Sequence, residues 1–280
     1  MVVVVEVVVV VAVSTVVDVW VVSVDGELVV VSVDDGVVTV TFSTCRVRVS
    51  ARRGPGEPFL RLTADIDNDA PDHRLVAALE LGSPCETSTA GAPFEIVTRF
   101  PRGEGGASEP PARQWPARGF VRGDREGFLS EGVVEYELLD HYTLAVTLLR
   151  CTGTISRQGA LRERAVRAGP DVATPDAQMI GHTTIPFGVF AGYDDPIELW
   201  ERYALPLLVG GASGADHAPL RGALLDVDAP ALSSVRKRGG TTEARVWNPW
   251  PDAVDARIGG EWMSLGPHRV EVVELAPPSV

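Results

Sequence analysis

Short runs of β-branched and other apolar residues, separated by turn-forming residues, dominate this sequence and limit what it can fold into. The clearest unit consists of Leu28–Val33 and Val37–Phe42, which are joined by Asp34-Asp35-Gly36. An Asp-Gly turn between two apolar runs is the strongest short signal for a β-hairpin. Comparable runs recur at Phe59–Ile66, Leu75–Leu81, Phe94–Phe100, Gly119–Val121, Val133–Leu139, Leu144–Leu149, Ala244–Trp247, Ala253–Ile258 and Val270–Leu275. With 28 Gly and 21 Pro available for the turns, the sequence predicts an all-β fold built as a large antiparallel sandwich.

Composition divides the chain into three parts. Residues 1–26 form a Val-rich, low-complexity N-terminus, and the valine bias favours strand over helix. Residues 27–215 hold most of the predicted strands and one short amphipathic helix, Pro196–Leu205. Residues 216–280 follow a Gly-rich segment and again alternate strands with turns, so they predict a second, small β-domain.

The charge balance argues against nucleic acid as a partner. The chain has 25 Lys and Arg against 38 Asp and Glu, a net charge of −13 and a pI near 4.8. Binding to a phosphate backbone would therefore need a local basic patch. The longest basic cluster, Arg236-Lys237-Arg238, precedes two glycines and is predicted to lie in a solvated turn.

The N-terminus and the cysteines predict a cytoplasmic protein with no membrane partner. The apolar residues 1–24 begin without Lys or Arg and are interrupted by Glu6 and Asp18, which disfavours both a secretory signal and a membrane span. The three cysteines, Cys45, Cys85 and Cys151, lie far apart and form neither a disulfide framework nor a CxxC motif.

Local motifs for catalysis or metal binding are absent from the sequence. Asp65-Ile-Asp67-Asn68-Asp69 begins like a calcium loop, but Ala70 and Val76 stand where an EF-hand needs Gly and Glu. Apolar residues alternate from Leu60 to Ile66, which places the first two of these aspartates on the solvent side of a strand. The five histidines are too far apart for a motif such as HExxH, and no GxSxG, Walker or dinucleotide-binding pattern occurs.

Single residues neither favour nor exclude a role for this chain in carbohydrate chemistry. Glycosidases use paired carboxylates, but carboxylates are too abundant here for any pair to be selected. Trp115, Trp247, Trp250 and Trp262 could offer flat faces to sugars, although the rings in Trp247-Asn-Pro-Trp250 are expected to close the end of a sandwich core.

A series of short motifs between Phe59 and Phe190 identifies a family resemblance. The motifs are Leu62-Thr-Ala-Asp-Ile-Asp-Asn68, Asp72-His-Arg-Leu75, Ser108-Glu-Pro-Pro111, Trp115-Pro-Ala-Arg-Gly-Phe-Val121, Glu135-Tyr-Glu-Leu138, Leu144-Ala-Val-Thr-Leu-Leu-Arg150, Ile155-Ser-Arg157, Ala168-Gly-Pro170 and Thr174-Pro-Asp-Ala-Gln178. In order and spacing they resemble the C-terminal half of glycoside hydrolase family 38, the zinc-dependent α-mannosidases, in its bacterial branch. Arg245-Val-Trp-Asn-Pro249 resembles the terminal β-domain of that family more loosely.

The resemblance implies a galactose-mutarotase-like supersandwich of antiparallel strands over residues 27–215, followed by a small C-terminal β-sandwich domain over 216–280. It also implies a partner, a catalytic α/β domain in cis or in trans, because the family holds its zinc there with a His-x-Asp pair that this sequence lacks. We therefore expect no cofactor in this chain and no catalytic residue. Arg150, Arg157 and Gln178 occupy motif positions and carry donors for sugar hydroxyls, so they are the candidate substrate-binding residues for a mannoside.

Two other functions stay open from the sequence. A stand-alone β-sandwich could bind carbohydrate or another chain. An independent mutarotase-like enzyme would need a histidine acid and a carboxylate base at one sugar, for which His141 and His182 are the histidines to inspect. Apolar surface that would pack against a catalytic domain could also drive the chain into a homo-oligomer.

Overall fold

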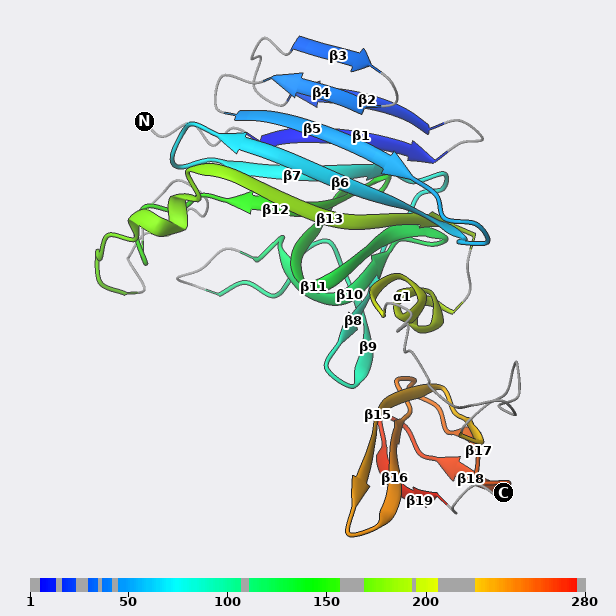
Figure 1. The fold of residues 1–280 in the computed structure, drawn as a ribbon. Helices are drawn as coiled ribbons and strands as arrows, with labels where there is room; N and C mark the ends of the chain where they lie inside the picture. Colours follow the sequence, from blue (N-terminus) through cyan, green and yellow to red (C-terminus); the bar gives the residue numbers. More distant parts are fainter. Residues whose placement is uncertain are drawn as a thin grey trace. The chain divides into compact units, whose positions relative to one another are not determined.

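The computed structural model divides the chain into two compact units, Met1–Gly91 with Thr98–Ala204 and Ala92–Val97 with Leu205–Val280 (Figure 1). The structure describes residues 6–13, 17–23, 30–34, 37–41, 45–106, 111–156, 169–192, 195–205 and 225–275. The predicted boundary between residues 215 and 216 lies outside these ranges. Within them the fold is all-β with one short α-helix, as predicted.

The first unit is built on one large sheet. The strands of this sheet are β1 (Glu6–Val13), β2 (Val17–Ser23), β3 (Val30–Asp34), β4 (Val37–Thr41), β5 (Cys45–Arg52), β6 (Phe59–Asn68), β7 (Arg74–Glu80), β8 (Ser88–Ala92), β9 (Glu95–Arg99), β10 (Trp115–Arg122), β11 (Glu126–Asp140), β12 (Thr143–Arg150) and β13 (Gly181–Ala191), and the start of β9 belongs to the second unit. The main path runs β2-β1-β7-β12-β11-β13-β6-β5-β4-β3, and β10, β8 and β9 extend from β11. Among the described strands the pairing is antiparallel except between β1 and β7.

The large sheet forms two layers that enclose the core. Figure 1 shows β3, β4, β5, β6 and β13 in one layer and β1, β2, β7 and β12 in the other, with the long strand β11 between β12 and β13. Burial alternates along β6, where Leu62, Ala64 and Ile66 point into the core and Asp65 and Asp67 point outward. This confirms the predicted solvent side for the two aspartates. The predicted hairpin is also confirmed, since β3 pairs with β4.

Helix α1 (Pro196–Ala204) is fixed at both ends. The Asp195 carboxylate accepts hydrogen bonds from the backbone N–H groups of Ile197 (2.9 Å) and Glu198 (3.1 Å), which caps the N-terminus. At the other end, the Arg61 guanidinium donates to the Tyr203 carbonyl (2.9 Å). The helix predicted from its Pro start is thus confirmed and ends one residue earlier than expected. The described part of the chain contains no helix that is long and apolar enough to cross a membrane.

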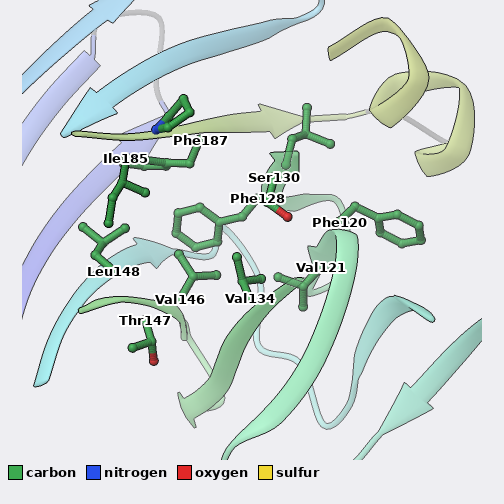
Figure 2. A pocket seen from close by; sticks show the side chains of 12 residues that line it. Phe120, Val121, Phe128, Ser130, Val134, Val146, Thr147, Leu148, Ile185 and Phe187 are labelled. Carbon is green, nitrogen blue, oxygen red and sulfur yellow. The ribbon is translucent and has the colours of Figure 1, made fainter. Parts of the chain in front are cut away.

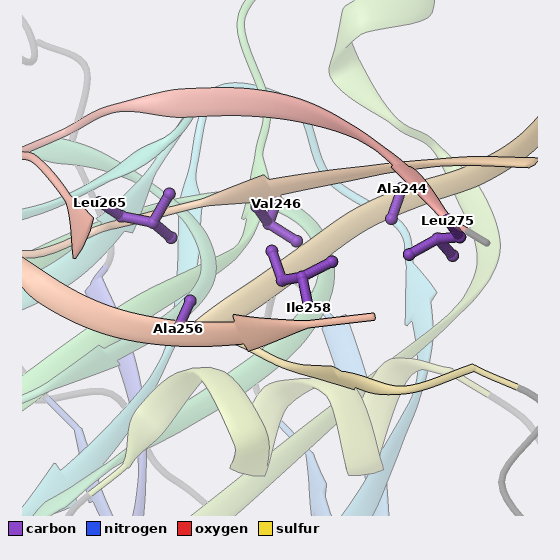
Figure 3. Close-up of a cluster of buried hydrophobic side chains, with 6 residues drawn as sticks. All are labelled: Ala244, Val246, Ala256, Ile258, Leu265 and Leu275. Atoms are coloured by element: carbon purple, nitrogen blue, oxygen red, sulfur yellow. The ribbon is translucent and has the colours of Figure 1, made fainter. Parts of the chain in front are cut away.

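The second unit has two three-stranded sheets. They contain β14 (Val227–Asp228), β17 (Val254–Ile258) and β18 (Glu261–Leu265), and β15 (Ala231–Arg238), β16 (Thr241–Trp247) and β19 (Val270–Leu275). Figure 3 shows the buried cluster between them, made of Ala244, Val246, Ala256, Ile258, Leu265 and Leu275.

Two features of the second unit bear on the sequence predictions. The basic cluster 236–238 lies in strand β15 and is exposed, so its placement in a turn was wrong, and the turn is formed by Gly239 and Gly240 at positive φ. Trp247 packs edge-to-face on Phe94 at 5.7 Å between ring centroids. Between the two tryptophans of its motif, Asn248 is fully buried, and the two N–H groups of its side chain are shared among the carbonyl oxygens of Asp252, Leu265 and Gly266, which fixes the corner after β16.

Candidate functional site

Arg150 lies at the end of β12 and belongs to a charged network on one face of the β7–β12–β11 layer. It pairs with Arg74 in the β7 register, and its half-exposed guanidinium donates from Nη1 to the Glu135 carboxylate. The same carboxylate accepts a hydrogen bond from the Thr147 hydroxyl (2.9 Å). Arg150 is therefore held in place by β11 while part of its guanidinium faces solvent.

Arg74 joins two carboxylates beneath this surface. Its Nε lies 3.0 Å from Thr147 Oγ1 and 3.3 Å from Glu135 Oε1, and its Nη1 donates to Glu137 Oε1. Gln114 Nε2 donates to the other oxygen of Glu137 at 3.0 Å. The Arg74 and Glu137 side chains are each only 4% exposed, so both charges depend on this pairing.

The strand register explains why these side chains meet. Glu137 stands opposite Ala145 on β12, which stands opposite Ala78 on β7, and Thr147 stands opposite Val76. Directly opposite residues share a face of the sheet, so Glu135, Glu137, Thr147 and Arg74 project to the same side. Because the side chains of Ala78 and Ala145 on this face are small, they leave room for the long charged side chains.

The network is suited to holding charge and offers little for acid–base chemistry. Glycoside hydrolysis needs one carboxyl that can give up a proton and one carboxylate that is free to attack or to activate water. Here both Glu135 and Glu137 accept charge-assisted hydrogen bonds from arginines. Outward-facing N–H groups of Arg150 are what the network can present to a ligand.

Gln178 is engaged in ordering a loop. It ends the 3₁₀ helix η1 (Pro175–Gln178), its Oε1 accepts a hydrogen bond from the Asp72 N–H (2.8 Å), and its Nε2 donates to Asp72 Oδ1 (3.0 Å). Asp72 has a φ of 59°, a left-handed conformation that this two-point contact stabilises. Gly153 allows the close approach, because a Cβ at that position would lie 2.6 Å from Gln178 Nε2.

Two of the three predicted sugar-binding residues lie at the same end of the layer. The Thr152 N–H, two residues after Arg150, donates to the carbonyl of Ala177, the residue before Gln178 (3.0 Å). Arg157 lies outside the described residues. Sequence reasoning missed Arg74, Glu135 and Glu137, although an Arg and a Glu-x-Glu pair inside apolar strands are signals of buried charge that calls for partners.

A buried Cys–His pair lies beside Gln178. Cys151 Sγ is 3.9 Å from His73 Nε2, and both residues are almost fully buried. Burial raises the pKa of Cys151 and lowers the pKa of His73. A nucleophilic dyad needs the thiolate and the imidazolium, and burial disfavours both of these charged forms here.

The outer face of the other layer carries exposed polar side chains from two neighbouring strands, β6 and β13. His182 Nδ1 lies 2.8 Å from Asp67 Oδ1, and Thr184 donates to Asp65 Oδ1 at 2.7 Å. The hydrogen bond from His182, followed by the charges of Arg48 and Arg46, lowers the pKa of Asp67. These contacts link neighbouring strands on an exposed face.

One cavity inside the first unit is too small for a sugar. Figure 2 shows it between β10, β11, β12 and β13, with Phe128, Val134, Val146, Ile185 and Phe187 among its walls. Its volume of about 30 Å³ is room for about one water molecule, whereas ligand pockets are typically 300–1,000 Å³.

The mutarotase-like arrangement and a zinc site both lack a matching set of side chains in the described part of the chain. His182 contacts Asp67 on an open strand face, His141 Nδ1 contacts the Cys85 carbonyl (2.9 Å), and neither histidine lines the cavity. Over the described ranges, no group of three or more His, Cys, Asp or Glu side chains converges to hold a metal ion. The side chains in these described ranges therefore do not fit the zinc of the family that the sequence resembles.

Comparison with solved structures finds proteins of similar fold. Over 84% of this chain, the structure resembles a protein in glycosyl hydrolase family 38 from Enterococcus faecalis, with a TM-score of 0.62 and 20% sequence identity. It resembles an alpha-mannosidase from Enterococcus faecalis V583 over the same share, with a TM-score of 0.63 and 19% identity. The chain spans only 30% and 29% of these two structures.

At this identity the likeness establishes a shared fold. The expected resemblance to the β region of family 38 is confirmed at that level. A scan against protein-family models finds no match to the sequence, and a search of curated proteins finds none either.

Proposed function

We propose that this chain is the non-catalytic C-terminal β region of a family 38 α-mannosidase. It would act in mannoside hydrolysis together with a catalytic α/β domain, supplied in cis or in trans, that holds the zinc and the nucleophile. The observation that supports the proposal is the likeness of 84% of this chain to about 30% of two family 38 structures.

In this proposal, the charged network supports a role for this region beside the sugar. Arg150 is held at the edge of a layer by Glu135, so its remaining N–H groups can donate to sugar hydroxyls without first being ordered. Buried Arg74 and Glu137 keep Glu135 in position. Gln178 contributes by shaping the adjacent loop, and Arg157 remains a candidate contact.

A chimera tests the proposal. In the Enterococcus faecalis α-mannosidase, the segment that this chain resembles is replaced by this chain, and soluble yield and turnover of an aryl α-mannoside are measured. We expect a folded chimera that retains turnover, and a control chimera carrying an unrelated β-sandwich of equal size that does not.

Variants of the chimera separate sugar contact from folding. Arg150→Ala is expected to weaken turnover modestly, chiefly through KM, and Arg238→Ala, at an exposed strand end of the second unit, is expected to leave turnover unchanged. A chimera no more active than the control chimera would contradict the proposed function.

A carbohydrate-binding module that works without any catalytic domain is the second candidate. One observation favours it, the exposed indole of Trp262 in the second unit.

A further inference from the structure

Trp262 is a large aromatic side chain that the fold does not need for its core. It lies on β18 and is 70% exposed. Side chains alternate along this strand, so Met263 and Leu265 point toward the core of the second unit while Trp262 and Ser264 point outward. Figure 3 shows Leu265 reaching into the buried cluster.

The neighbours of Trp262 on the outer face are charged. Arg257 on β17 stands directly opposite Trp262, and Asp228 on β14 stands directly opposite Arg257. All three residues are exposed. Arg257 Nη2 donates to Asp226 Oδ1 at 2.7 Å, which orders the guanidinium.

We infer that Trp262, Arg257 and Asp228 form a carbohydrate-binding platform on the outer face of the β14–β17–β18 sheet. A pyranose presents an apolar face of C–H groups, which can stack on the indole, and a rim of hydroxyls that both donate and accept hydrogen bonds. Arg257 supplies donors to that rim and Asp228 supplies acceptors, and bonds to charged groups are the stronger kind.

The surroundings of the ring favour a sugar over a protein partner. Protein interfaces place an aromatic hot spot inside a desolvated apolar area. On the described strands of this sheet, Trp262 is the only exposed large apolar side chain, and Asp228, Asp255, Arg257 and Ser264 share its face. A single ring bordered by polar groups matches one sugar unit of a longer chain.

One ring on an open surface binds a single sugar weakly, so a repeating polymer is the appropriate probe. The full-length chain is run in native gels that contain yeast α-mannan, xylan or hydroxyethylcellulose, and retardation relative to a polysaccharide-free gel gives the affinity. We expect retardation by at least one of these polymers. Trp262→Ala should weaken it about tenfold or more, and Trp262→Phe should retain most of it.

Controls separate a local platform from a folding effect. Phe100→Ala removes another aromatic side chain of similar exposure, 67%, from the first unit and is expected to leave retardation unchanged. Arg257→Ala should weaken retardation while the urea midpoint of the chain stays near that of the wild type. Retardation by none of the polymers, or equal retardation of the wild type and Trp262→Ala, would overturn the inference.

The platform follows from the second unit alone, and only its preference for mannose depends on the proposed function. Retardation by α-mannan that requires Trp262 would support both. Retardation by xylan or hydroxyethylcellulose, but not by α-mannan, would leave the platform standing and would count against a mannoside as the substrate.

Discussion

Replacing Gly119 by alanine tests whether a close approach between β10 and α1 positions the helix on the sheet. Gly119 has a φ of +83° at an irregularity in the β10–β11 register, and a Cβ there would lie 2.8 Å from Trp200 Cε2 and 2.9 Å from Trp200 Nε1. The left-handed backbone costs an alanine about 1–2 kcal/mol. Overpacking against the ring costs about 1–3 kcal/mol, because Trp200 is held by a 2.9 Å hydrogen bond from its Nε1 to the Ser130 carbonyl. We expect Gly119→Ala to lower the free energy of unfolding by about 2–5 kcal/mol.

Urea unfolding followed by far-ultraviolet circular dichroism measures this loss. Gly56→Ala is the matched control, because Gly56 also has a positive φ (+74°) but has nothing within 4 Å of the added Cβ. It should lose only the backbone contribution, about 1–2 kcal/mol. In a Trp200→Leu background, Gly119→Ala should cost less than it does in the wild type. Equal losses for Gly119→Ala and Gly56→Ala would refute the proposed close packing of α1.

The remaining predictions concern buried polar groups. Glu137→Ala leaves the charge of Arg74 buried without one of its carboxylates and should cost about 3–5 kcal/mol in urea unfolding, while Glu80→Ala at the exposed end of β7 should change little. Asn248→Ala removes an amide whose two N–H groups serve three backbone carbonyls and should lower the unfolding free energy by about 2–4 kcal/mol; a change below about 0.5 kcal/mol would count against its role in the corner. Burial raises the pKa of Glu201 above 4.5, so the folded state holds that proton more tightly than the unfolded state and loses stability as pH rises above 4.5. Glu201→Gln should therefore raise Tm at pH 7 and leave it unchanged at pH 3, and equal effects at both pH values would contradict this linkage.

Local sequence signals were sufficient to predict the elements whose structure is determined within one short segment. The β3–β4 hairpin and α1 each carry their start or turn signal within a few residues. Strand β13 was missed because Pro186 interrupts its apolar run. Pro186 is accommodated because β13 pairs only with β6 at that point, and its pairing with β11 begins at Gly188, so the missing N–H breaks no ladder bond to β11.

The candidate site could be predicted only as single residues. Arg150 and Gln178 were chosen for their donors, but their partners Glu135 and Asp72 lie 15 and 106 residues away in the chain. Such contacts are set by the register of strands and by the order β7-β12-β11 in the sheet, and neither is encoded in a local pattern. The parallel pairing of β1 with β7 is likewise a long-range feature that valine content could not predict.

Turnover of an aryl α-mannoside by the purified full-length chain, with and without added zinc, tests the central claim most directly. The account predicts no hydrolysis above that of a control preparation, purified identically from cells that lack the gene. Glu135 and Glu137 accept hydrogen bonds from arginines and are not free to act as acid or nucleophile. Binding a sugar equally well in the ground state and the transition state does not lower the chemical barrier. Hydrolysis that persists after host mannosidases are removed, and that is lost in Glu135→Gln, would show a working carboxylate in the sandwich and would contradict the account.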